Sequence, residues 1–184
     1  MGWILLIVGV ALWWAAHMFK RVMPERRAAM GDGGRGIVAL ALAVSILLMI
    51  FGYRMAPTVF VWSPPGFLVH FNNLLMLIAI YMLSPAPKRG KLLQGMRHPM
   101  LTGFALWAAA HLVVNGDWAS ILLFGGLLAW VPVQTAAINK AEPDWTPNTG
   151  GTVAKDAMFL AGSVVLMGVI GYIHYLLGRW PFPG

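Results

Sequence analysis

The stretch that decides the fold is the first apolar run, which reads GWILLIVGVALWWAAHMF over residues 2–19. It contains no acidic or basic residue apart from His17, and Lys20 and Arg21 follow it directly. A helix needs about 20 apolar residues to cross the hydrocarbon core of a bilayer. A cleaved secretion signal carries its positive charges before the apolar core, whereas here they come after it. The run is therefore predicted to be a retained membrane span with its N-terminus outside.

The composition of the whole chain extends this interpretation. Of the 184 residues, 59% are hydrophobic and only 10% are charged, whereas soluble domains usually carry about a quarter charged residues. Five further apolar runs, separated by connections rich in glycine and proline, occupy residues 36–53, 66–83, 99–114, 118–137 and 157–178. We expect an all-α polytopic membrane bundle of six transmembrane helices, forming one domain over residues 1–184.

The positions of the basic residues predict the orientation of this bundle. With the N-terminus outside, Arg54 and Arg179 are the only two of the 13 lysines and arginines that fall in outside loops. An excess of Lys and Arg marks the cytoplasmic side of a membrane protein. Tryptophans, which prefer the interface, fall at the outer side at positions 3, 62, 118 and 180. Both termini are therefore predicted to lie outside the cytoplasm in a multi-pass membrane protein. The net charge of +7 then indicates lipid headgroups rather than nucleic acid as the partner.

Residue types that are missing exclude several kinds of chemistry. The chain has no cysteine, which excludes disulfides, thiolate catalysis, iron–sulfur clusters and covalent haem attachment. All six acidic residues lie in predicted loops or at helix ends. Proton-coupled transporters usually place a carboxylate within a span, so this distribution disfavours that class. Paired-carboxylate hydrolysis is equally unsupported.

Histidines remain as candidates for function. His17, His70, His111 and His174 fall within predicted spans, and His98 falls at the start of the fourth. An ionisable group in a span indicates a functional site by default, because its removal from water costs free energy. The structural alternative is a hydrogen bond between helices. Without thiols or carboxylates, the chemistry that fits best is ligation of haem iron by neutral imidazole.

Depth within the predicted bilayer favours one pair of these histidines. At about 1.5 Å of rise per residue, His70 and His111 lie near the outer ends of their spans and share a level. His17 lies near the inner end of its span, so it would be separated from His111 by about 15 Å in height. Depth alone therefore favours His70 and His111 as axial partners.

The segment RHPMLTG at residues 97–103 is a second candidate site. Proline suits the first turn of a helix, and the exposed N-terminus of a helix binds anions, here beside Arg97. Arg97 and His98 are therefore candidate cofactor-binding residues. The structural alternative is a cytoplasmic helix start whose arginine reaches the headgroups.

The chain resembles the NnrU family, bacterial membrane proteins associated with nitrite and nitric oxide reduction in denitrification. The motifs that carry the resemblance are AAH at 15–17, RHPMLTG at 97–103, LWAAAH at 106–111, NGD at 115–117 and LLFGG at 122–126. The likeness covers essentially the whole chain. It implies nitric-oxide pathway proteins or a hydrophobic small molecule as partners, and it leaves open whether the protein is an enzyme.

This family looks related to 15-cis-zeta-carotene isomerase, which binds b-type haem through histidines. That likeness makes His17 and His111 the implied ligand positions, with His70 kept as a candidate from depth. A further histidine of the isomerase would fall on Trp130, so that part of the pattern is missing. The two resemblances together imply either a nitric-oxide-linked role or isomerase-like redox chemistry. The Arg97-His98-Pro99 segment also resembles membrane methyltransferases that bind S-adenosylmethionine at the cytoplasmic face. A methyltransferase-like protein and a non-catalytic accessory protein are therefore the alternatives to a haem protein.

Overall fold

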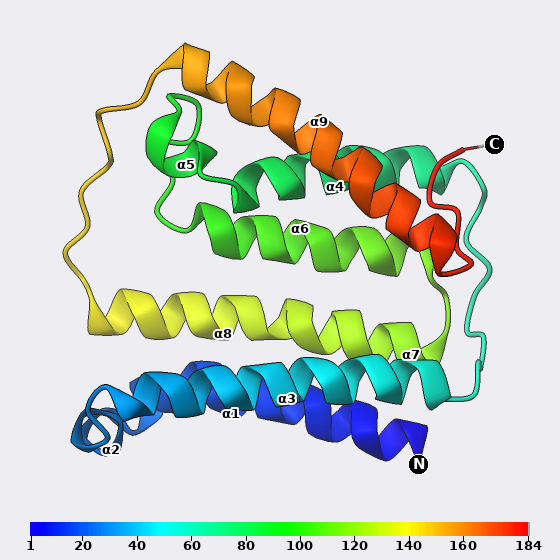
Figure 1. The fold of residues 1–184 in the computed structure, drawn as a ribbon, viewed down its shortest axis with the longest axis horizontal. Coiled ribbons are helices and arrows are strands. Elements are labelled where there is room, and N and C mark those ends of the chain that lie inside the picture. Colours follow the sequence, from blue (N-terminus) through cyan, green and yellow to red (C-terminus); the bar gives the residue numbers. More distant parts are fainter. Residues whose placement is uncertain (184) are drawn as a thin grey trace. The chain divides into compact units, whose positions relative to one another are not determined.

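The structure, a computed structural model, describes residues 1–183, which are mostly helical (Figure 1). Within these residues no β-strand forms, and one isolated β-bridge joins Phe60 to Asp117. The elements are α1 (Gly2–Val22), α2 (Pro24–Ala29), α3 (Gly33–Met55), α4 (Leu68–Leu83), α5 (Ala86–Arg89), α6 (Pro99–Val114), α7 (Trp118–Ser120), the π-helix η1 (Ile121–Gly125), α8 (Gly126–Ala141) and α9 (Val153–Leu176). The prediction of an all-α protein is confirmed.

Four helical segments are long and apolar enough to cross a membrane. They are α1, α3, the continuous segment Trp118–Ala141 formed by α7, η1 and α8, and α9. Many large apolar side chains of α1, α3 and α9 are exposed in the structure, as lipid-facing residues are. The helices α4 and α6 are apolar but have only 16 residues each. These helices support a membrane protein, and all six predicted apolar segments are helical.

The chain divides into two compact units. Unit 1 contains Met1–Ser63 and Gly116–Pro143, and therefore α1, α2, α3, α7, η1 and α8. Unit 2 contains Pro64–Asn115 and the described residues from Asp144 onward, and therefore α4, α5, α6 and α9. Each unit is built from segments that are far apart in the sequence.

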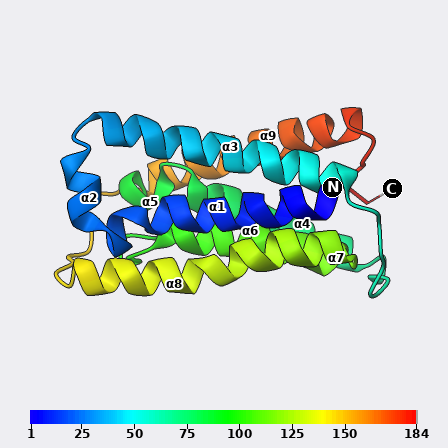
Figure 2. The ribbon, with the colours of Figure 1, turned by 90° about the horizontal axis from the view of Figure 1, so that it is seen from below.

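Unit 1 is organised around α1, which packs against both α3 and α8 (Figure 2). The helices α1 and α3 run antiparallel and approach closely because glycines line their contact. A side chain at Gly52 would overlap the backbone of Leu6, and one at Gly9 would lie 2.8 Å from the backbone nitrogen of Met49. Close approach through small residues is the usual way in which helices associate in a membrane, where dispersion forces replace the hydrophobic effect.

A polar network closes unit 1 at the end where α3 finishes and α7 begins. The Asp117 carboxylate accepts the backbone N–H of Ser120 at 3.0 Å and its hydroxyl at 2.7 Å. The Tyr53 hydroxyl lies 2.9 Å from the same hydroxyl. The Trp118 N–H donates to the Val59 carbonyl beside the β-bridge. These bonds cap α7 and fix the chain that follows α3 to the start of the α7–α8 segment.

Unit 2 is organised around α4, which packs against α6 and α9. The first turns of α6 lie against the last turns of α4, since a side chain at Gly103 would lie 2.9 Å from Met82 Cβ. Tyr81, near the end of α4, contacts Asp156 in the first turn of α9. Both α6 and α9 therefore run antiparallel to α4. Tyr81, Met82 and Ala86 form the buried core of this unit.

Substitution of Gly52 tests the close contact between α1 and α3. In an open helical position, glycine to alanine gains up to about 1 kcal/mol of helix propensity. At Gly52 the added methyl meets backbone atoms, and overpacking typically costs about 1–3 kcal/mol. Gly52→Ala should therefore lower the melting temperature of the purified protein. The matched control, Gly162→Ala in α9, meets nothing within 4 Å and should not lower it. An equal response of the two variants would contradict this packing.

Candidate functional site

His17 lies near the C-terminal end of α1 in unit 1. Its Nδ1 is 3.0 Å from the backbone carbonyl of Trp13, one turn earlier. Its ring packs between two indoles, with centroid distances of 4.2 Å to Trp13 and 4.6 Å to Trp130. Trp130, the position at which the isomerase likeness implied a further histidine, therefore contacts His17 edge-on. Helix α1 and two tryptophans hold the imidazole in one orientation.

The hydrogen bond of His17 decides which ring nitrogen can bind a metal. A carbonyl oxygen only accepts, so Nδ1 carries the proton and Nε2 keeps a lone pair in the neutral ring. Histidines that bind metals usually donate their other ring N–H to a carboxylate, a backbone carbonyl or water. The same bond also satisfies a histidine that is merely buried in a helix. The feature of His17 that a merely buried histidine does not need is the cavity beside its ring.

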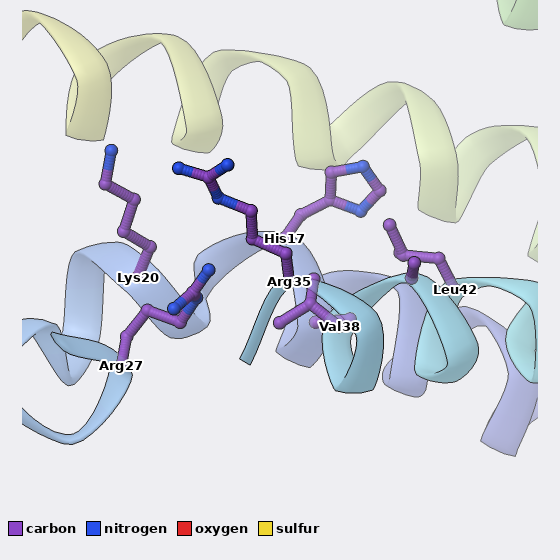
Figure 3. Close-up of a pocket in the computed structure, with 8 residues that line it drawn as sticks. His17, Lys20, Arg27, Arg35, Val38 and Leu42 are labelled. Carbon is purple, nitrogen blue, oxygen red and sulfur yellow. The ribbon is translucent and has the colours of Figure 1, made fainter. Parts of the chain in front are cut away.

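A cavity of about 350 Å³ opens beside His17 at the junction of α1, α2 and α3 (Figure 3). Its lining combines basic and apolar side chains from these three helices. They are Ala16, His17, Lys20, Arg27, Arg35, Val38, Ala39 and Leu42. In Figure 3 the three basic side chains lie on one side of the His17 ring, and Leu42 lies on the other. The cavity thus joins an imidazole, a cluster of positive charge and an apolar wall.

Three other histidines lie at one end of unit 2. His111 and His174 repeat the geometry of His17, with Nδ1 2.8 Å from the carbonyls of Trp107 and Ile170 respectively. His70 lies in the first turn of α4 and is exposed. Because α4 runs antiparallel to α6 and α9, its first turn lies at the end where the other two helices finish. The predicted common level of His70 and His111 therefore agrees with the helix directions in unit 2.

The three candidate metal ligands do not all belong to one unit. His17 is in unit 1, whereas His70 and His111 are in unit 2. Within residues 1–183, no three or more His, Asp or Glu side chains gather in a way that could hold a metal ion.

Arg97 and His98 lie in unit 2, directly before α6. His98 is the N-cap residue, and its carbonyl accepts the backbone N–H and the hydroxyl of Thr102, both at 3.0 Å. Pro99 occupies the first helical position, as the sequence predicted. Both candidate residues are half-buried. The segment 97–99 is thus an ordered helix start.

Asp156 is a buried polar residue that the sequence analysis did not single out. It lies in the first turn of α9 and is only 4% exposed. Its carboxylate accepts the Tyr81 hydroxyl at 2.5 Å and the backbone N–H groups of Lys91 and Leu92 at 2.7 and 3.1 Å. Asp156 therefore fixes the start of α9 to the end of α4 and to the loop that leads to Arg97. The sequence signal for it was an acidic residue placed directly at the start of a long apolar run.

Comparison with known protein families identifies the relatives of this chain. The family described as NnrU protein matches residues 5–181. The chain belongs to the NnrU family. The match includes His17 with the lining of its cavity and all the candidate residues of unit 2. Searches of curated proteins and of solved structures found no match.

Neutralisation of Asp156 tests its role in this NnrU protein. Asp156→Asn replaces one acceptor oxygen by an NH₂ donor, so buried N–H groups lose a partner at a cost of about 1–3 kcal/mol. We expect a lower melting temperature than for the control Asp144→Asn, which changes an exposed loop residue. Tyr81→Phe removes one of the bonds and should fall between the two. Equal melting temperatures for Asp156→Asn and Asp144→Asn would contradict the conclusion that the hydrogen bonds of Asp156 stabilise unit 2.

Proposed function

We propose that this NnrU-family protein binds b-type haem non-covalently through His17 in the bacterial inner membrane. It would serve a redox or nitric-oxide-linked step that supports nitrite and nitric oxide reduction. The observation that carries the proposal is the state of His17, whose Nδ1 donates to Trp13 while the ring borders a cavity. The lone pair on Nε2 is the form that a haem iron requires.

The side chains around His17 are of the kinds that surround a haem ligand, namely aromatic and apolar ones. Two indoles position the imidazole, and Ala16, Val38 and Leu42 provide apolar surface. When bound, haem supplies an iron that changes oxidation state and binds nitric oxide. The protein's part is to orient the ligand ring, keep its Nδ1 proton on Trp13, and limit the access of water. His70 and His111, which lie in unit 2, stay predictions from the sequence as ligand positions.

The alternatives predict different measurements. A methyltransferase-like protein would bind S-adenosylmethionine near Arg97 and His98, and calorimetry would show saturable binding that Arg97→Ala removes. A non-catalytic accessory protein would use its histidines only as hydrogen-bond donors to helix carbonyls. Each His→Ala substitution would then lower thermal stability without any spectral change. The haem proposal is preferred because His17 combines the required tautomer with a neighbouring cavity.

We also propose that α4 and α6 span the membrane, which gives six spans with both termini periplasmic. The β-bridge between Phe60 and Asp117 lies at the predicted outer end of unit 1. The chain passes from there, at Ser63, into unit 2 and α4. Helix α5, which follows α4, contacts the chain that precedes α9, because the Arg89 carbonyl accepts the Thr152 N–H and the Lys88 carbonyl accepts the Asn148 side chain. That chain follows α8 and is predicted to be inside. With 16 residues each, α4 and α6 are about 24 Å long, so their flanking turns complete the crossing.

Haem titration of the purified protein tests the function. Wild-type protein given haemin should show a Soret band at one haem per chain that shifts on reduction with dithionite. His17→Ala should weaken binding about a hundredfold or more, because altering a residue that merely orients a ligand already costs about 10–100-fold. His98→Ala, the control, should retain the band. No Soret band, or a spectrum for His17→Ala like that of wild type, would refute the proposal.

Labelling of introduced cysteines tests the six-span topology. The chain has no cysteine of its own, so no native thiol reacts with the label. Lys88→Cys lies inside if α4 and α6 cross the membrane and outside if only the four long segments do. We expect a membrane-impermeant maleimide added to intact spheroplasts to leave Lys88→Cys unlabelled. Arg179→Cys, outside in both arrangements, should be labelled, and Glu142→Cys, inside in both, should not. Labelling of Lys88→Cys equal to that of Arg179→Cys would exclude six spans.

A further inference from the structure

The cavity beside His17 concentrates positive charge from three separate elements. Lys20 lies in the last turn of α1, Arg27 in α2 and Arg35 in the first turns of α3. Figure 3 shows the three side chains gathered on the same side of the His17 ring. The turn between α1 and α3 therefore brings together charges that are up to 15 positions apart in the sequence.

These charges are not balanced by acidic side chains. Within residues 1–183, none of the three forms an ion pair with a carboxylate, although Arg21 next to Lys20 binds Glu142 at 2.8 Å. The Arg27 guanidinium instead donates to the carbonyl of Gly31 at 3.1 Å. Like charges that share one cavity repel one another, and an anion in the cavity would relieve that repulsion.

The apolar part of the cavity lining indicates what the rest of a bound anion would be like. Opposite the basic side chains, the wall is formed by Ala16 together with Val38, Ala39 and Leu42 of α3. This face continues along α3 to the exposed Ile46, four residues after Leu42. A free inorganic anion would make no favourable contact with this apolar wall. A ligand with an anionic head and a long apolar body matches both parts.

We propose that this cavity binds one anionic phospholipid. Its phosphate lies among Lys20, Arg27 and Arg35, and an acyl chain follows Val38 and Leu42 along α3. The predicted orientation places the cavity at the cytoplasmic surface, where anionic lipids gather and basic pockets between helices bind their headgroups. The bound lipid would neutralise the α1–α3 turn and anchor the inner end of α1, which carries His17. This proposal does not depend on haem binding.

The test uses haem-free protein in detergent and native mass spectrometry. Phosphatidylglycerol and phosphatidylcholine are the two probes. We expect one phosphatidylglycerol to remain bound per chain, with much weaker retention of phosphatidylcholine. At about fivefold in affinity for each basic residue near the membrane surface, the triple variant Lys20→Gln/Arg27→Gln/Arg35→Gln should bind about a hundredfold more weakly. The matched control Lys88→Gln/Arg89→Gln/Lys140→Gln loses the same charge at exposed positions and should bind normally.

A second variant addresses the apolar wall without a change of charge. Ala39→Trp places a large ring in the cavity at an exposed position of α3, so it should exclude the lipid while the fold persists. Equal loss in the two triple variants, equal retention of the two lipids, or normal binding by Ala39→Trp would overturn the proposal. Haem and the lipid would share the wall formed by Val38 and Leu42, so the test concerns the haem-free protein, and added haemin is expected to release the lipid.

Discussion

Hydrocarbon offers no hydrogen bonds, so polar groups in the apolar helices of this protein must find partners within the chain. Side chains meet this demand locally. His17, His111 and His174 each place Nδ1 against the carbonyl four residues earlier, and Ser163 donates to the carbonyl of Phe159 in the same way. For the histidines, the constraint has a chemical consequence, because it assigns the proton to Nδ1 and the lone pair to Nε2. The Nε2 lone pair of His17 is thus available because Nδ1 hydrogen-bonds a backbone carbonyl of its own helix.

Hydropathy and charge were sufficient to predict the local features of the fold. Each predicted apolar segment became a helix because helix formation in an apolar run satisfies every backbone group without a distant partner. Pro99 predicted the start of α6 correctly, since proline is favoured in the first turn. The family was also identified correctly, from the motifs at 97–126. The short helices α2 and α5 were not predicted, since they lie in connections that carry no apolar periodicity.

The features that depend on distant residues were not accessible from the sequence. The burial of Asp156 requires Tyr81, 75 positions earlier, and periodicity cannot show such a pairing. The cavity beside His17 required the turn that brings Arg27 and Arg35 to the end of α1. His70, in the first turn of α4, and His111, in the last turn of α6, lie at the same end of unit 2, as the depth argument predicted, because depth follows from position along a helix. It could not show that His17 borders a cavity, which depends on packing.

Replacement of the His17 side chain by a free ligand tests the central claim most directly. His17→Gly removes the imidazole while leaving the tryptophans and the cavity, so exogenous imidazole can occupy its place. The account predicts that this variant fails to bind haem and that millimolar imidazole restores a wild-type Soret band, with no such rescue in His98→Gly. A His17→Gly protein that binds haem unaided, with the wild-type spectrum, would contradict it.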